Sequence, residues 1–256
     1  ARSQDVKLVV NQLSAAQRLV DMMFDGVPAE NLPGDRAEIE AGVRARMTGR
    51  LHHVGSNPTT APVIEGSFLR LIDLLDVHLA GRSYLFGGRP AVADFGLASQ
   101  LGQLLSDPTS GALIRGRAPR VVAYVARMDA PVAEGPFEGL DALRPTLSAL
   151  LSLEVAGCYL PWSLANSEAV QAGQSELHVT LQGVAFQQNT QRYAAKALHE
   201  LKRKRAFYSD DAALAALLEE TGCEAFLAVQ PRSGGAGDDT GQDGPDGDDD
   251  GEDGED

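Results

Sequence analysis

Residues 84–95, YLFGGRPAVADF, decide the fold of this chain. The turn at residues 87–90 precedes an apolar run, which predicts a helix from about Ala91 to Leu105. Asp94 is the third residue of that helix, where a carboxylate accepts a hydrogen bond from the N-cap N–H and faces the positive end of the helix dipole. A hydroxyl at the N-cap would complete the capping box, but that residue is Ala91. We therefore predict Asp94 as a structural N-capping residue worth about 0.5 to 2 kcal/mol.

The apolar pattern extends from this helix in both directions. Apolar residues wrap most of the circumference of the 91–105 helix, so we expect it to be the most buried helix. Spacings of three and four residues predict further helices at residues 5–24, 35–54, 64–79, 112–115 and 118–128. The same spacing predicts a long helix from 141 to about 172, which Gly157 and Pro161 should break or kink.

The pattern changes near the C-terminal end. Residues 176–186 alternate at a period of two around Gln182-Gly183, which predicts a small β-hairpin. Two helices are predicted after it, at about 190–205 and 210–221. Residues 231–256 are rich in Gly and Asp and are predicted to be disordered. The predicted fold class is therefore all-α, with a small α+β extension of a hairpin and two helices, and a disordered acidic tail.

Charge and cysteine content narrow the class of protein. The formal charge is -14, of which residues 231–256 carry -10 through eleven acidic residues and one Arg. The remaining body has too little charge to favour nucleic-acid or anionic membrane binding. Cys158 and Cys223 lie far apart and lack zinc-site spacing. With no signal-peptide layout and no long uninterrupted apolar run, we expect a cytoplasmic protein without nucleic-acid or membrane partners.

The residue types that often carry chemistry do not form a site in this sequence. Residues 246–251 match the first half of a calcium loop, but the sequence ends before its twelfth position. His52 and His53 would point about 100° apart on a helix, which is unfavourable for sharing a metal ion. Cys158 lies in an apolar helical run, which predicts a buried and unreactive thiol. We predict no metal ligand, no cofactor-binding residue and no catalytic residue in this chain.

One dense basic run, Lys202-Arg203-Lys204-Arg205, has two interpretations. It could bind nucleic acid, or it could form a cationic last helical turn that faces the negative end of the helix dipole. In the second interpretation the run also pairs transiently with the acidic tail. The weak charge of the body favours this second interpretation.

Two blocks of sequence resemble the C-terminal domain of glutathione S-transferases. Residues 84–95 are similar to the capped central helix of that domain, although Ala91 replaces the family's Ser or Thr. Residues 117–128, RAPRVVAYVARM, resemble the helix that follows. The resemblance implies a helical domain over residues 1–140 and a bacterial-type helical extension with a small β-hairpin over 141–230. The acidic tail that the composition predicts follows over 231–256.

The resemblance also implies a function that this chain performs only in part. In the family a thioredoxin-like domain precedes the helical one and supplies the glutathione site and the Ser, Tyr or Cys that stabilises the thiolate. Residues 61–67 resemble its cis-Pro loop only superficially, because the residues before them have a helical pattern. The parent protein would then conjugate glutathione, its co-substrate, to a hydrophobic electrophile, while this chain alone is inactive.

The first predicted helix would line the substrate cleft in this view, with Gln12, Gln17 and Met22 as weak candidates for contact. The resemblance implies a homodimer as well. The alternative is a non-catalytic protein-interaction module of the same fold, because helical domains of this kind also occur as assembly parts.

Overall fold

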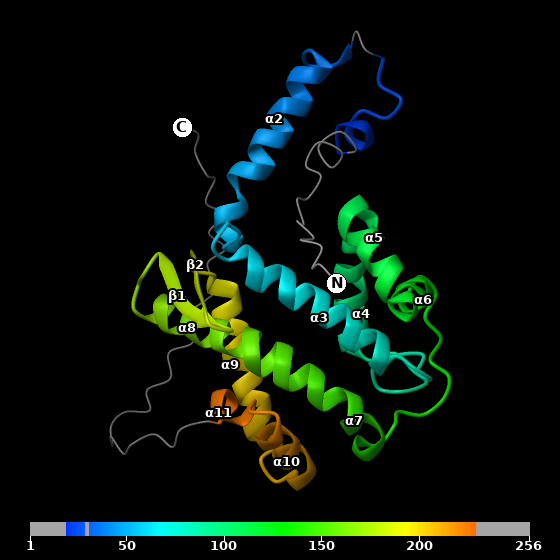
Figure 1. Cartoon of the computed structure of the whole chain (residues 1–256), viewed down its shortest axis with the longest axis vertical. Helices are drawn as coiled ribbons and strands as arrows, with labels where there is room; N and C mark the ends of the chain where they lie inside the picture. Colours follow the sequence, from blue (N-terminus) through cyan, green and yellow to red (C-terminus); the bar gives the residue numbers. More distant parts are fainter. Residues whose placement is uncertain (1–18, 29–30, 229–256) are drawn as a thin grey trace, which may run out of the picture.

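The computed structural model describes residues 19–28 and 31–228. Most of the predicted first helix and the whole predicted disordered tail lie outside these residues. The described part is mostly helical with one antiparallel two-stranded sheet (Figure 1). This arrangement confirms the predicted all-α class with a small α+β extension.

The elements follow one another in nearly the predicted order. The helices are α2 (Arg36–Gly49), the 3-10 turn η2 (Leu51–Val54), α3 (Ala61–His78), α4 (Val92–Ser106), α5 (Pro108–Arg117), α6 (Pro119–Arg127), α7 (Leu140–Leu150), the π-helix η3 (Leu151–Tyr159), α8 (Leu160–Gln171), α9 (Arg192–Phe207), α10 (Ala212–Glu220) and α11 (Glu224–Leu227). Strands β1 (Glu176–Leu181) and β2 (Val184–Asn189) form the predicted hairpin, with Leu181 opposite Val184.

Two predicted helix boundaries were wrong for local reasons. The predicted 35–54 helix is split, because α2 ends at Gly49 and the 3-10 turn η2 follows. The short helix predicted at 112–115 is the longer α5. Its start is fixed by the Asp107 side chain, which accepts hydrogen bonds from Thr109 N at 2.8 Å and Ser110 N at 3.0 Å. Asp107-Pro108 therefore ends one helix and begins the next.

The long apolar helix is continuous from Leu140 to Gln171 but contains the π-helix η3. The irregularity ends beside Pro161, where Leu160 N–H bonds to Val155 O, five residues back. This wider turn accommodates a proline, which lacks an N–H and crowds the preceding turn. By length and composition this run could also cross a membrane. In the structure it packs against α3, α9 and β1.

Buried apolar residues gather in three clusters. The first lies among α3, α4, α5 and α6, with Ile72, Leu101 and Tyr124 almost fully buried. The second joins the hairpin to α3 and α8 through residues such as Phe186. The third packs α8, α9, α10 and α11 around Leu198. The hairpin and the last helices are thus attached by apolar contacts to the helices before them.

The expectation that α4 is the most buried helix was wrong. Within α4 only Asp94, Ala98 and Leu101 are buried, whereas Val92 is 90% exposed and Phe95 is 52% exposed. The helix packs on α5 and α6 with one face. Apolar residues on all sides of α4 suggested that every face is covered. In the described part of the chain, neighbouring elements cover only one face.

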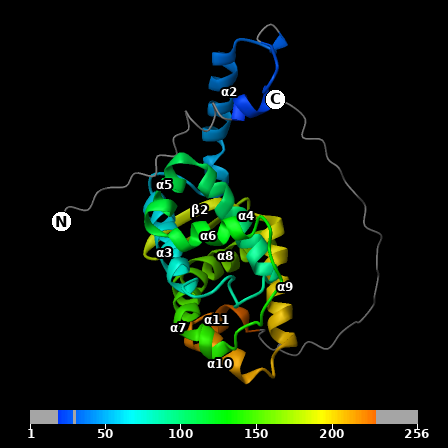
Figure 2. The ribbon, with the colours of Figure 1, turned by 90° about the vertical axis from the view of Figure 1, so that its right-hand side faces the viewer.

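Helix α2 and residues 19–28 form an arm that stands away from the other helices (Figures 1 and 2). Asp35 caps α2 as predicted, because its carboxylate accepts from Ala37 N at 2.9 Å. An ion pair between Asp21 and Arg36 joins the two segments of the arm. No residue of α2 whose burial is described is buried, whereas Val20 in the other segment of the arm is fully buried. Helix α2 therefore presents most of its described surface to its surroundings.

Candidate functional site

Asp94 has a fully buried side chain at the start of α4. Its Oδ2 accepts a hydrogen bond from Ala91 N at 2.7 Å, and its Oδ1 accepts one from Leu85 N at 2.8 Å. The Tyr124 hydroxyl donates to Oδ1 at 3.1 Å. Ala91 offers no hydroxyl, and Asp94 N–H donates instead to the Ala91 carbonyl at 3.0 Å. One carboxylate thus joins α4 to the preceding turn and to α6.

Tyr124 completes this centre from α6. Its side chain is fully buried, and burial together with the Asp94 carboxylate raises the pKa of Tyr124. The phenol therefore stays protonated and donates its hydrogen bond throughout the neutral pH range. Because Asp94 and Tyr124 are both sealed from solvent, this centre holds the helices together and offers no surface to a substrate.

A second polar group lies where α3 faces the π-helix, and we call it the Glu154 cluster. It consists of Ser67, Arg70, Glu154, Cys158 and Gln182. Glu154 is 8% exposed, and its carboxylate accepts from the Ser67 hydroxyl and from Arg70 Nε at 2.6 Å. π-Helical segments are frequent at functional sites, which makes this cluster a candidate. Sequence reasoning missed it, because its members come from three elements with no shared spacing.

Cys158 is half-buried, whereas the sequence predicted a buried thiol. Its sulfur lies 3.0 Å from Nε2 of Gln182. Gln182 is the first residue of the hairpin turn and has a φ of 50°. Burial and the Glu154 charge raise the pKa of the Cys158 thiol, with burial the larger cause. The arrangement opposes formation of a thiolate, so it does not resemble the electropositive surroundings of a nucleophilic cysteine.

We expect Glu154→Gln to speed alkylation of Cys158 by iodoacetamide about three- to tenfold at pH 7, because removing the neighbouring charge lowers the thiol pKa. Mass spectrometry of the labelled chain measures the rate against pH. Ser67→Ala is the matched control: it leaves the carboxylate in place and removes a hydroxyl contact that lowers the pKa of Cys158. That variant should label no faster than the wild type. Equal rates in Glu154→Gln and wild type would contradict the electrostatic explanation.

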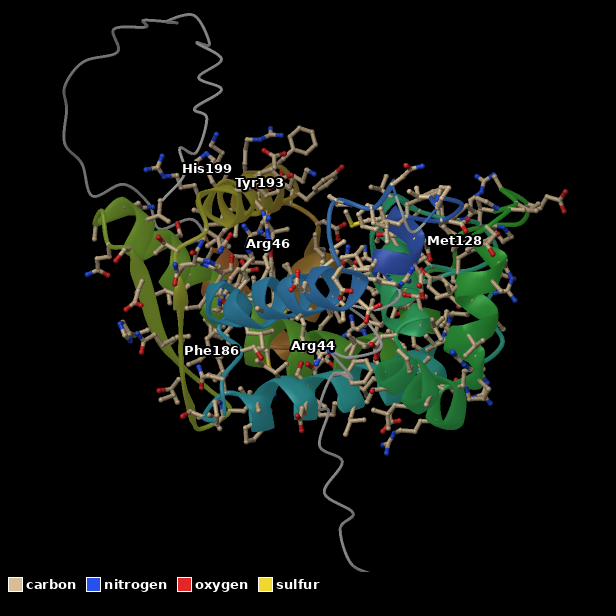
Figure 3. All side chains as sticks on the ribbon, turned by 90° about the horizontal axis from the view of Figure 1, so that it is seen from above. Arg44, Arg46, Met128, Phe186, Tyr193 and His199 are labelled. Atoms are coloured by element: carbon tan, nitrogen blue, oxygen red, sulfur yellow. The ribbon has the colours of Figure 1, made fainter. Side chains whose placement is uncertain are left out.

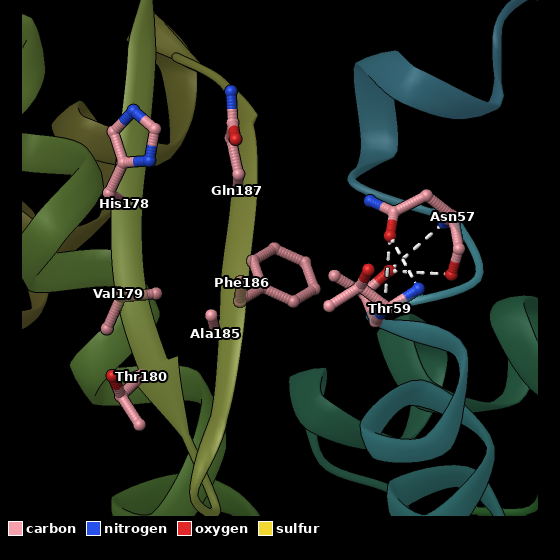
Figure 4. Close-up of a pocket in the computed structure, with 9 residues that line it drawn as sticks. Asn57, Thr59, His178, Val179, Thr180, Ala185, Phe186 and Gln187 are labelled. Atoms are coloured by element: carbon pink, nitrogen blue, oxygen red, sulfur yellow. Dashed lines mark hydrogen bonds between the residues drawn. The ribbon is translucent and has the colours of Figure 1, made fainter.

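A groove of about 510 Å³ lies between the hairpin and the turn before α3 (Figure 4). The Phe186 ring points toward that turn (Figure 4). Asn57 and Thr60 already satisfy one another, because Asn57 N donates to Thr60 Oγ1 at 3.0 Å and Thr60 N donates to Asn57 Oδ1 at 3.1 Å. Its lining has hydroxyl, amide and imidazole groups but no acidic side chain. The groove therefore lacks the paired titratable groups that acid–base chemistry requires.

Metal binding has no support in the described part of the chain. Within residues 19–28 and 31–228, no three His, Cys, Asp or Glu side chains form a group that could hold an ion. The fragment at residues 246–251, which matches only the first half of a calcium loop, lies outside the described residues.

The arm carries three of the exposed apolar residues of the described part of the chain. Met22 is 73% exposed, Met23 is 59% exposed and Val27 is 40% exposed, and we call these three residues the arm patch. Of the three candidates for cleft contact, Gln12 and Gln17 lie outside the described residues and Met22 lies in this patch. Neighbouring exposed apolar residues often mark an interaction site.

Residues 37–127 match the family model described as "Glutathione S-transferase, C-terminal domain". The match runs from α2 to the end of α6, so it covers the larger segment of the arm, the capped α4 and almost all of the second resembling block. Comparisons with curated proteins and with solved structures gave no match.

Proposed function

Because residues 37–127 match the family model of the glutathione S-transferase C-terminal domain, we propose that this chain supplies the substrate-side half of a glutathione transferase. The family match is the observation that carries the proposal. In the complete protein a thioredoxin-like domain holds glutathione, and its thiolate attacks an electrophilic carbon of a hydrophobic molecule. A carbon–sulfur bond forms, the leaving group departs with the bonding electrons, and the thiol proton passes to solvent.

The arm patch supports this division of labour. Methionine side chains are flexible and polarisable, so Met22 and Met23 suit apolar molecules of varied shape. Three charged groups of the arm are paired, because Arg36 binds both Asp21 and Glu40. They are therefore poorly placed to lower the pKa of a bound thiol. In the proposal the arm binds the electrophile, and the thioredoxin-like domain activates glutathione.

The remaining parts of the proposal follow from the same family. Glutathione is a co-substrate of the parent protein and is not held by this chain, and the parent is a homodimer in the cytoplasm. It acts on small molecules and has no nucleic-acid or membrane partner. The presence of Cys158 and Cys223 as free thiols supports a reducing compartment.

The test uses the complete encoded protein, with glutathione and chlorodinitrobenzene as substrates. Changing Met22→Asp and Met23→Asp together should raise the KM for chlorodinitrobenzene about tenfold, because the apolar contact is worth roughly 1.4 kcal/mol. The KM for glutathione should stay nearly constant. Val77→Asp is the matched control, since Val77 is also exposed, at 57%, but lies on α3.

Two results would overturn the proposal. A complete protein that conjugates glutathione to none of a panel of electrophiles would favour the non-catalytic interaction module. Tight binding of glutathione by residues 1–256 alone would show that the glutathione site is in this chain and would contradict the assigned division of labour.

A further inference from the structure

Helix α9 is strongly basic although the whole chain carries a charge of -14. Between Arg192 and Phe207 it has six Lys and Arg residues and a single acidic residue, Glu200. The helix therefore carries a local charge of about +5, far from the average of the protein. A concentration of like charge on one helix needs an anionic partner or solvent to stabilise it.

Four of the cationic and imidazole side chains lie on one face. Leu198 is buried in the third apolar cluster and marks the inner side of α9. Arg192, Lys196, His199 and Arg203 follow one another at spacings of four, three and four, which places them together on the opposite side. All four are exposed, and we call them the basic stripe. Figure 3 shows His199 on the outer side of α9.

The basic stripe is poorly neutralised by the described residues. Arg192 and Lys196 make no ion pair within residues 19–28 and 31–228. Glu200 is shared, because it pairs with Arg203 at 2.7 Å and with Lys204 at 3.8 Å. Like charges four residues apart destabilise a helix, so Arg192 and Lys196 repel each other. An added anion would relieve this repulsion.

The chain itself supplies a candidate anion within reach of this helix. Its described part ends at Ala228, just after α11, which packs against α9. Nine residues later begins the acidic segment 238–256, with eleven Asp and Glu residues. Those nine residues can span about 30 Å, whereas α9 is about 24 Å long. The acidic segment can therefore reach every residue of the basic stripe.

We propose that the acidic segment 238–256 binds the basic stripe of α9 in the same chain. Tethering gives the segment an effective concentration on the order of 1 mM at the stripe, which makes even a weak contact significant. The contact is exposed to solvent, so salt screens it over a Debye length of about 8 Å at physiological ionic strength. The segment relieves the repulsion within α9 and occupies the surface that a foreign polyanion would otherwise use.

Hydrogen exchange of α9 peptides tests the proposal in two full-length proteins. One has the natural sequence, and the other has all eleven acidic residues of 238–256 changed to Asn or Gln. At low salt the natural protein should exchange about threefold more slowly in α9, as expected when a contact at 1 mM has a Kd near 0.5 mM. In about 1 M NaCl this difference should vanish.

The stripe itself is tested by repeating the comparison in two charge-reversal backgrounds. Lys196→Glu with Arg203→Glu should abolish the effect of the acidic segment. Arg46→Glu with Arg50→Glu makes the same charge change on exposed residues of and beside α2, and it should leave the effect intact. Equal α9 exchange with natural and neutralised segments would overturn the proposal. Protection that increases with protein concentration would also overturn it, because the contact would then join two copies.

Discussion

Asp94→Ala is expected to lower the free energy of unfolding by about 3 to 5 kcal/mol, because the change leaves buried donors without an acceptor. The N–H groups of Leu85 and Ala91 donate to the Asp94 carboxylate and would lose this acceptor. The Tyr124 hydroxyl would lose Oδ1 at 3.1 Å and keep only the Asp94 backbone carbonyl at 3.2 Å. An ordinary helix cap contributes only about 0.5 to 2 kcal/mol. The larger expected loss reflects a carboxylate that joins three segments.

Urea denaturation of the variant measures this loss, and three further substitutions divide it. Asp94→Asn keeps one acceptor and should show a smaller loss. Tyr124→Phe removes only the hydroxyl and should lower stability by about 1 kcal/mol. Ala91→Ser restores the missing hydroxyl of the capping box and should stabilise the protein by about 0.5 to 1 kcal/mol. An unchanged urea midpoint in Asp94→Ala would contradict the structural role.

The sequence predicted only part of the hydrogen-bonded centre around Asp94. The capping pattern involves neighbouring residues, whereas the contact with Tyr124 joins residues that are far apart in the chain. The spacing between Ala91 and Asp94 indicates the cap directly. Tyr124 lies thirty residues further along the chain, and nothing in its spacing indicates that its hydroxyl reaches Asp94. The additional stability therefore depends on how α6 packs against α4, which became visible only in the folded structure.

Predictions of elements from neighbouring residues were mostly correct, whereas predictions that depend on contacts between distant elements were wrong or missing. The hairpin was predicted from the alternation around Gln182-Gly183, and this prediction was correct because its two strands are neighbours in the sequence. Exposure of Val92 was missed, because it depends on whether another element covers that face of α4. The Glu154 cluster was missed because Ser67 and Glu154 are brought together by packing of α3 against η3. Local signals thus predicted elements better than they predicted the groups that meet between elements.

Gly55→Ala is expected to lower the free energy of unfolding by about 2 to 4 kcal/mol, from backbone strain and overpacking together. Gly55 has a φ of +68°, which favours glycine. An added Cβ would lie 2.6 Å from Cζ of Phe186 and 3.0 Å from the carbonyl oxygen of Gln187. The hairpin approaches the chain after η2 too closely for a side chain to fit.

Gly81→Ala is the matched control for this second prediction, because Gly81 has a φ of +81° but no atom within 4 Å of the added Cβ. Gly81→Ala should lower the free energy of unfolding by only about 1 to 2 kcal/mol, which is the cost of backbone strain alone. The excess loss in Gly55→Ala, measured by urea denaturation, then reports contact with Phe186. If the two variants lost equal stability, the close approach of the hairpin would be wrong. An excess would mean that residues 184–189 stabilise the segment at Gly55, so the hairpin extension and the family-matched helices fold as partners.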